Sequence, residues 1–225
     1  HFHKIKSFSN VKFQNSEIWL GDNTKFDCFN KKLQKNVDVI ITSPPYATAL
    51  PYIDTDRLSL LSILGLPSKK RRKTEFVLTG SREIKPDAKG MIENDIKNRN
   101  FKQIKSQIAT NLIKKLYKTN LNSNAGFRKK NMPSLLYRYF LNISLTLGNI
   151  DKLIKKNGSV FFVVGDNFTV VQDKKIIIPT TSIFHQLSSS FGWNMIEKIP
   201  ISVTTENLHH IGKAIKRNSI LHYKK

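Results

Sequence analysis

The sequence predicts an α/β protein built on an open, mostly parallel sheet with an antiparallel edge. Two continuous apolar runs, at residues 37–41 (VDVII) and 159–167 (SVFFVVGDN), are rich in β-branched and aromatic residues, as expected for parallel strands buried on both faces. Segments with apolar residues three and four positions apart alternate with these runs, which predicts helices between the strands. Such alternation indicates a doubly wound sheet.

In the first third of the chain the expected order is strand, helix, strand, helix. Residues 13–20 (FQNSEIWL) predict a short strand, and residues 24–36 predict a short helix through Phe26, Phe29 and Leu33. The strand at 37–41 follows. Residues 54–66 (DTDRLSLLSILGL) then predict a helix that packs on the sheet.

The rest of the chain predicts two long helices and three further strands. Apolar periodicity indicates helices over 95–118 and 133–155, the second ending at Asn157-Gly158. The strand at 159–167 follows, then a helix over 183–191 and strands over 193–201 and 218–223. We expect the last two strands to pair as an antiparallel edge.

Polar corners follow three of the predicted strands. They are Gly21-Asp22-Asn23, Ser43-Pro44-Pro45-Tyr46 and Gly165-Asp166-Asn167. Ligands of open α/β sheets bind at the carboxyl ends of the strands. We therefore expect the three corners to meet on one edge of the sheet.

The charge balance predicts a polyanionic partner, and nucleic acid is the favoured one. Lys and Arg outnumber Asp and Glu by 38 to 16, a net charge of +22, which attracts the protein to phosphate backbones. Residues 67–130 hold 18 of the basic residues and 5 of the acidic ones. The densest run, which we predict to contact nucleic acid, comprises Lys69, Lys70, Arg71, Arg72 and Lys73. A merely solvated loop is the alternative.

Several other classes of protein are disfavoured. No apolar run approaches the roughly 20 residues that span a bilayer, so we expect a soluble, cytoplasmic protein. The single cysteine, Cys28, excludes an internal disulfide. The histidines are scattered without the cysteine or carboxylate spacing of a metal site, so no metal is expected.

The most informative string is Ser43-Pro44-Pro45-Tyr46, which closes the strand at 37–41. An exocyclic base amine is a weak nucleophile because its lone pair is delocalised into the ring, so a catalyst must draw it toward a tetrahedral geometry with oriented acceptors. The prolines remove amide donors and leave carbonyls, and the Ser43 hydroxyl is a further acceptor. Tyr46 offers a face on which a base can stack. A rigid turn without catalytic function is the alternative.

This string resembles motif IV of the S-adenosylmethionine-dependent DNA amino-methyltransferases, which read Asp, Asn or Ser followed by Pro-Pro and an aromatic residue. The resemblance implies a Rossmann-like methyltransferase sheet, with S-adenosylmethionine as cofactor and DNA as partner. Ser43 and the Pro44 carbonyl would hold the amine, Pro45 would complete the motif, and Tyr46 would stack on a flipped base. A serine in first place is more similar to the cytosine-N4 enzymes than to the adenine-N6 enzymes.

The resemblance also implies a cofactor contact and a missing complement. Asp22 and Asn23 occupy the place of the acidic corner that contacts the cofactor adenine, although an ordinary turn would read the same. The family's Phe-x-Gly-x-Gly segment, which ends its first strand, is absent. We therefore expect the first strands and the glycine-rich loop to come from a longer chain or from a second polypeptide. Residues 1–66 and 131–225 would form the catalytic α/β part, with 67–130 as a basic insertion.

Three other functions remain open from the sequence. Adenine-N6 methylation differs from the cytosine-N4 reading only at Ser43. Guanine-N2 methylation of RNA uses the same kind of amine chemistry. A non-catalytic nucleic-acid-binding subunit would need the basic segment but gives no reason for the Ser-Pro-Pro-Tyr corner.

Overall fold

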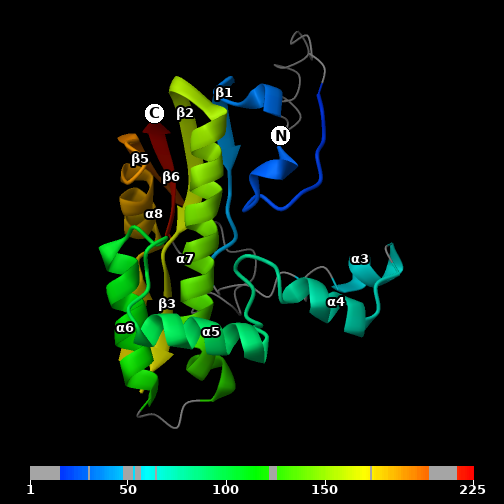
Figure 1. The fold of residues 1–225 in the computed structure, drawn as a ribbon, viewed down its shortest axis with the longest axis vertical. Helices are drawn as coiled ribbons and strands as arrows, with labels where there is room; N and C mark the ends of the chain where they lie inside the picture. The colour runs from blue at the N-terminus through cyan, green and yellow to red at the C-terminus, as the bar shows by residue number, and fades with distance from the viewer. Residues whose placement is uncertain are drawn as a thin grey trace.

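The computed structural model describes residues 16–29, 31–47, 53, 57–63, 65–121, 126–172, 174–202 and 217–225. Its main sheet has the strand order β1-β2-β6-β5 (Figure 1). The bounds of these strands are Val37–Thr42 for β1, Ile154–Gly165 for β2, Arg217–Lys224 for β6 and Asn194–Ser202 for β5. The apolar runs that predicted strands at 37–41 and 159–167 thus form two neighbouring strands.

Three of the four strands in this sheet run in the same direction. β1 pairs with β2 in parallel, and β6 pairs antiparallel with both β2 and β5. The predicted α/β class, with a mostly parallel sheet and an antiparallel pair formed by the last two strands, is confirmed. β6 lies inside the sheet and β5 forms the edge, because β6 inserts between β2 and β5.

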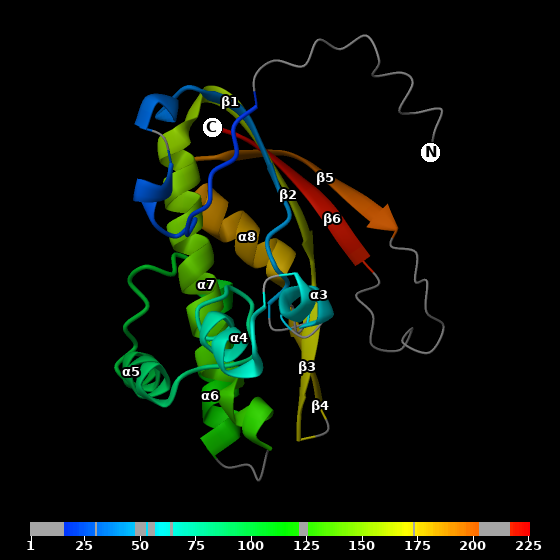
Figure 2. The same cartoon turned by 90° about the vertical axis from the view of Figure 1, so that its right-hand side faces the viewer.

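One face of the sheet is covered by helices. α7 (Phe127–Leu153) and α8 (Thr180–Ser189) both lie on this side (Figure 2). Side chains alternate along the second half of β2, so that Val160, Phe162 and Val164 are buried against the helices. Phe162 lies at the centre of an aromatic cluster with Phe184, Trp193 and Tyr223. This burial of apolar surface is the main source of stability on that face.

The opposite face of the sheet carries no helix of the described part of the chain (Figure 2). On β1, Val39 is 50% exposed and Ile41 is 74% exposed. Their neighbours in register include Phe161, which stacks on His222 at a centroid distance of 4.2 Å. Parallel sheets are ordinarily covered on both faces, so this face is unusual for the fold.

The basic segment contributes helices that pack onto the same core. Its helices are α4 (Ser68–Glu75), α5 (Pro86–Lys97) and α6 (Gln107–Leu121). α5 and α6 pack against α7, and Ile113 and Leu116 of α6 are fully buried in the main core. Much of the segment is therefore part of the folded body.

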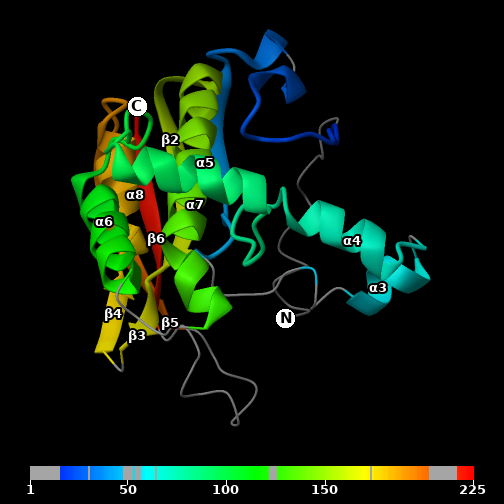
Figure 3. The ribbon, with the colours of Figure 1, turned by 60° about the horizontal axis from the view of Figure 1, so that its bottom comes forward.

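α4 projects to one side together with the short α3 (Arg57–Ser62), as Figures 1 and 3 show. The helix predicted over 54–66 is thus shorter among its described residues. It also leads away from the sheet, and none of the residues of α3 is buried. The expectation that this helix packs on the sheet is therefore wrong.

The start of the chain departs from the sequence-based prediction. Residues 13–15 of the predicted strand at 13–20 lie outside the described residues, and residues 16–20 form no strand. Ile18 and Leu20 are almost wholly exposed, so the apolar pattern there has no packing partner within the described chain. The predicted helix over 24–36 is also wrong, because this stretch forms two short 3-10 turns, Phe26–Cys28 and Lys31–Leu33.

The predicted single helix over 95–118 is wrong as well. α5 ends at Lys97 and α6 begins only at Gln107. Asp95 stabilises the break, since its backbone carbonyl and its carboxylate each accept a hydrogen bond from Asn100 at 2.8 Å. A hairpin of β3 (Asn167–Val171) and β4 (Lys174–Ile178) was not predicted.

The second long helix agrees better with the sequence-based prediction than the first. α7 contains Pro133 and ends at Leu153, and the left-handed residue that follows is Asn157, with φ +65°, rather than the expected Gly158. No helix in the described ranges combines the length and apolarity needed to cross a bilayer.

Candidate functional site

The Ser-Pro-Pro-Tyr corner directly follows β1, at the carboxyl end of that strand. Ser43 is exposed, and its hydroxyl lies 3.5 Å from the carbonyl oxygen of Val163 on β2. The hydroxyl is the donor in this long, weak contact, so the lone pairs of the Ser43 oxygen stay available to accept from a ligand. No hydrogen bond between described residues uses the Pro44 carbonyl.

The second half of the corner is fixed from two other elements. The Tyr139 hydroxyl of α7 donates to the Pro45 carbonyl at 2.8 Å. The Asn218 amide of β6 donates to the Tyr46 hydroxyl, also at 2.8 Å. The side-chain Oδ1 of Asn218 is buried and has no hydrogen-bond partner among the described residues. The Tyr46 ring is thus held at its hydroxyl end, and the Pro45 carbonyl is already occupied.

A loop of the basic segment packs directly against the corner. Gly80 has φ +82°, and a Cβ atom added there would lie 3.0 Å from both Pro45 Cβ and the Tyr46 carbonyl oxygen. Only glycine adopts this backbone conformation without strain. The absence of a side chain therefore allows the loop to approach the motif backbone.

Arg138 of α7 holds that loop in place. Its guanidinium donates to the backbone carbonyls of Phe76, Ser81 and Glu83 at 3.0, 3.1 and 2.8 Å. Burial lowers the pKa of Arg138, since it removes water from the charged group. Three carbonyl acceptors offset that cost, and the loop that carries Gly80 becomes a fixed wall of the site.

The corner after β2 meets the Ser-Pro-Pro-Tyr corner, as predicted. The Asn167 amide donates to the carbonyl of Ala47 at 2.8 Å, and Gly165 pairs with Asn218 in the sheet register. Asp166 has a structural role, because its carboxylate accepts from the backbone N–H and the hydroxyl of Thr181 in the first turn of α8. A carboxylate at a helix N-terminus is stabilising.

The third corner, Gly21-Asp22-Asn23, does not follow a strand as expected, because residues 16–20 form none. It is hydrogen-bonded to α7 instead. Asn23 receives hydrogen bonds from Asn149 at its carbonyl and from Thr146 at its side chain, at 2.9 and 3.4 Å. Thr146 lies seven residues after Tyr139, about 10 Å along the helix axis. Asp22 is exposed, and hydrogen bonds from Thr24 lower the pKa of its carboxyl, with a smaller contribution from Lys25.

The densest basic run forms α4 rather than an irregular loop. Lys69, Lys70, Arg72 and Lys73 are exposed. Arg71 is buried, and its guanidinium donates to the Ser68 hydroxyl at 2.9 Å. The structure therefore presents four of the five predicted nucleic-acid contacts to solvent, whereas the Arg71 side chain folds back on the start of its own helix.

Across the described ranges, no group of three His, Cys, Asp or Glu side chains is arranged to hold a metal ion.

Comparison with known proteins yields a few distant structural matches. No protein-family model matches the chain, and no curated protein matches it at a significant level. A solved structure of a candidate DNA modification methylase from Thermus thermophilus aligns with a TM-score of 0.42 and 14% identity, over 92% of this chain and 52% of that one. The complex of that protein with S-adenosyl-L-methionine aligns over 40% of this chain and 38% of that one, with a TM-score of 0.33 and 20% identity. The chain thus spans about half the length of the Thermus thermophilus protein.

Four residues that build the site gave no recognisable signal in the sequence. Tyr139 and Asn218 lie 94 and 172 positions from the motif residues they bind. Gly80 and Arg138 act through a loop whose path cannot be read from periodicity. Gly80 followed by a polar stretch indicates a turn, but not which surface the turn contacts.

Proposed function

We propose that this chain carries the base-binding half of an S-adenosylmethionine-dependent enzyme that methylates an exocyclic amine of a DNA base, the N4 amine of cytosine. The observation that carries the proposal is that the second half of the Ser-Pro-Pro-Tyr corner is hydrogen-bonded within the protein, whereas the acceptors of its first half are open to a ligand. Tyr139 occupies the Pro45 carbonyl and Asn218 anchors Tyr46, whereas Ser43 stays exposed. The two acceptors at the start of the corner are those that the amine chemistry requires.

In this proposal each residue of the corner has a separate task. The Ser43 hydroxyl and the Pro44 carbonyl accept hydrogen bonds from the two N–H groups of the amine and draw its lone pair out of conjugation with the ring. The Tyr46 ring stacks on the base, which must leave the duplex to reach the site. The Gly80 loop packs on Pro45 and Tyr46, and Asn167 binds the Ala47 carbonyl, so the backbone that follows these acceptors is fixed. Preorganisation of this kind lowers a reaction barrier. No side chain acts as a covalent nucleophile.

The described residues fit the cofactor only in part. When bound, S-adenosylmethionine supplies an electrophilic methyl group on a sulfonium. Asp22 offers an ionised, exposed acceptor, because its lowered pKa keeps the carboxyl charged. Asn23 is fixed to α7 beside it. These two residues would hold the adenosine part, and the methionine part needs groups from elsewhere.

The uncovered face of the sheet supports the need for a complement. The edge of β1 that faces away from β2 has no strand partner among the described residues. A free strand edge is a template for further pairing, and on the uncovered face of the same strand Ile41 is 74% exposed. We propose that a segment with the glycine-rich loop, from a longer chain or a second polypeptide, pairs with β1 and covers this face. Lys69, Lys70, Arg72 and Lys73 remain proposed contacts to DNA.

Replacing Ser43 with alanine tests the proposed chemistry. The substitution removes one acceptor from the amine but leaves the backbone carbonyls in place. The single-turnover rate of methyl transfer, measured with labelled cofactor and the assembled enzyme, should fall by about 3- to 10-fold, the equivalent of one hydrogen bond. DNA affinity should change little, because the interaction is made in the transition state.

The matched control is Ser190→Ala. Ser190 lies just beyond the end of α8, and its hydroxyl donates to the Leu187 carbonyl. That variant should retain the wild-type rate. If Ser43→Ala weakened DNA binding and left the transfer rate unchanged, Ser43 would be a binding residue and the chain would fit a non-catalytic subunit better.

A further inference from the structure

A basic groove between α5 and α6 lies apart from the run on α4. It has a volume of about 790 Å³ and is lined by Ile96, Lys97, Arg99, Asn111, Lys114, Lys115, Tyr117, Lys118 and Leu121. Five of these side chains are cationic and none is acidic. Arg99 and Lys114 also line a neighbouring hollow of about 430 Å³, which adds Lys105.

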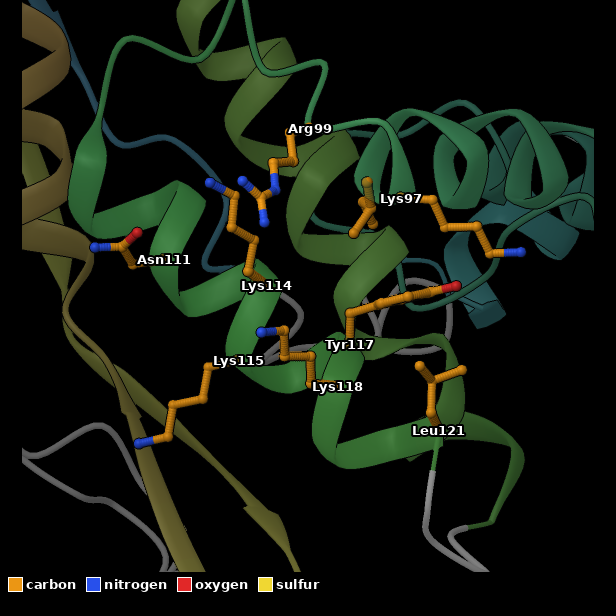
Figure 4. A pocket seen from close by; sticks show the side chains of 9 residues that line it. Lys97, Arg99, Asn111, Lys114, Lys115, Tyr117, Lys118 and Leu121 are labelled. Carbon is orange, nitrogen blue, oxygen red and sulfur yellow. The ribbon is translucent and has the colours of Figure 1, made fainter.

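In Figure 4 most of the cationic side chains lie on one side of the groove, whereas Tyr117 and Leu121 lie on the other side beside Lys97. Lys114 and Lys118 lie one turn apart on α6, and Arg99 extends toward Lys114 in this view. Ile96 is buried and Tyr117 is half-buried. The lining residues of α6 run from Asn111 to Leu121, about 15 Å along the axis. At 3.4 Å per nucleotide that length matches four to five phosphates of one strand, so a linear polyanion fits better than one small anion.

None of the five cationic side chains of the groove forms a salt bridge with a described residue. The nearest carboxylate in sequence, Asp95, accepts from the Asn100 amide at 2.8 Å and from the Tyr137 hydroxyl at 3.3 Å. Lys114 lies over the Phe101 ring at 5.2 Å. Like charges one turn apart destabilise a helix, and a bound polyanion would relieve this repulsion.

Arg99 is held in an unfavourable backbone conformation. Its φ is +55°, and its N–H donates to the Ile96 carbonyl at 3.2 Å, so it ends α5 in the left-handed region. Glycine or asparagine is the usual residue at such a position. Strain of this kind persists where the side chain is used, and here it places a guanidinium at the junction of the two hollows.

The groove is connected to the candidate active site through one helix. Tyr137 of α7 donates to the Asn100 carbonyl in the turn beside Arg99, at 2.9 Å. Two residues later, Tyr139 holds the Pro45 carbonyl of the motif. A strand bound in the groove is therefore fixed relative to the Ser-Pro-Pro-Tyr corner.

We propose that this groove binds the phosphate backbone of DNA and is a principal source of the chain's affinity for it. The inference rests on the proposed function only in taking DNA as the polyanion. It adds Arg99, Lys114 and Lys118 as the contacts, none of which belongs to the run on α4.

The test compares two charge-matched triple variants of the whole chain by fluorescence anisotropy with a labelled duplex, at several salt concentrations. The groove variant is Arg99→Gln, Lys114→Gln, Lys118→Gln. The control is Lys156→Gln, Lys174→Gln, Lys198→Gln, which removes the same charge from exposed positions on strands. In the groove variant the slope of log affinity against log salt should become less negative by about 2 to 3 units, and binding should weaken by at least about 10-fold at moderate salt. Equal losses in the two variants would overturn the inference.

A single variant separates affinity from folding. Arg99→Gly relieves the left-handed strain, so the melting temperature should stay the same or rise by about 1–3 °C, while the affinity for the duplex falls. Unchanged affinity would overturn the inference. Methyl transfer by the assembled enzyme distinguishes this failure from that of the proposed function. If the assembled enzyme methylates DNA but the groove substitutions leave DNA affinity unchanged, only the groove inference is refuted. If the substitutions weaken DNA binding but no methyl transfer is seen, only the proposed activity is refuted.

Discussion

Replacing Tyr46 with alanine should lower kcat/KM for methyl transfer by about 5- to 150-fold. The reason is the loss of base stacking, which contributes on the order of 1–3 kcal/mol. The substitution also removes the acceptor of the Asn218 amide, which donates to the Tyr46 hydroxyl at 2.8 Å. Steady-state kinetics of the assembled enzyme, with DNA as the varied substrate, measures the effect.

Tyr46→Phe is the matched control for stacking. It keeps the ring and loses only the hydroxyl, so we expect a loss below about 10-fold, the equivalent of one hydrogen bond. Tyr46→Trp should likewise retain much of the activity. If Tyr46→Ala were as active as Tyr46→Phe, the aromatic face would have no part in binding the base.

Substitution of Gly80 by alanine should have the second large effect. The new Cβ would lie 3.0 Å from Pro45 Cβ and from the Tyr46 carbonyl oxygen, at a φ of +82°. The loop cannot retreat easily, because Arg138 binds three of its carbonyls. Pro45 and Tyr46 must therefore shift, and a displacement near 1 Å in a catalytic site costs up to about 100-fold in rate. Single-turnover methyl transfer at saturating DNA measures the loss.

Two other glycines separate the possible causes of that loss. Gly65 has a similar positive φ of +57° but no atom within 4 Å of an added Cβ, so Gly65→Ala tests the backbone strain alone. Gly90, inside α5, also has open space, and Gly90→Ala should stabilise the helix by about 0.5–1 kcal/mol. If Gly65→Ala impaired methyl transfer as much as Gly80→Ala, backbone strain alone, without contact with the motif, would account for the loss.

Most strands of the main sheet and their relative directions could be predicted because the signals for them are local. Continuous apolar runs identify β1 and β2, and the pairing of β5 with β6 is expected because they are the last two predicted strands. The break between α5 and α6 could not be predicted, because the apolar period continues through 98–106 while Asp95 stabilises a turn there. The exposed apolar residues Ile18 and Leu20 mimic a strand that the described chain does not form.

The candidate site could be predicted in part for the same reason. Ser43 and Tyr46 belong to one contiguous string, and its position after β1 follows from the strand itself. The residues that fix this string come from α7, β6 and the Gly80 loop. Tertiary contacts of this kind have no sequence period. Likewise the groove draws Arg99 from the end of α5 and Lys114 from α6, so a charge count over 67–130 predicts its partner but not its place.

The central claim is that the Ser-Pro-Pro-Tyr corner presents a base amine for methylation. The most direct test incubates DNA with S-adenosylmethionine and with this chain joined to the proposed glycine-rich complement, then identifies the methylated nucleoside by mass spectrometry. We expect N4-methylcytosine, strongly reduced in the Tyr46→Ala enzyme. N6-methyladenine would retain the amine chemistry and change the base. A methyl group on a ring carbon, or undiminished methylation by Tyr46→Ala, would contradict the account.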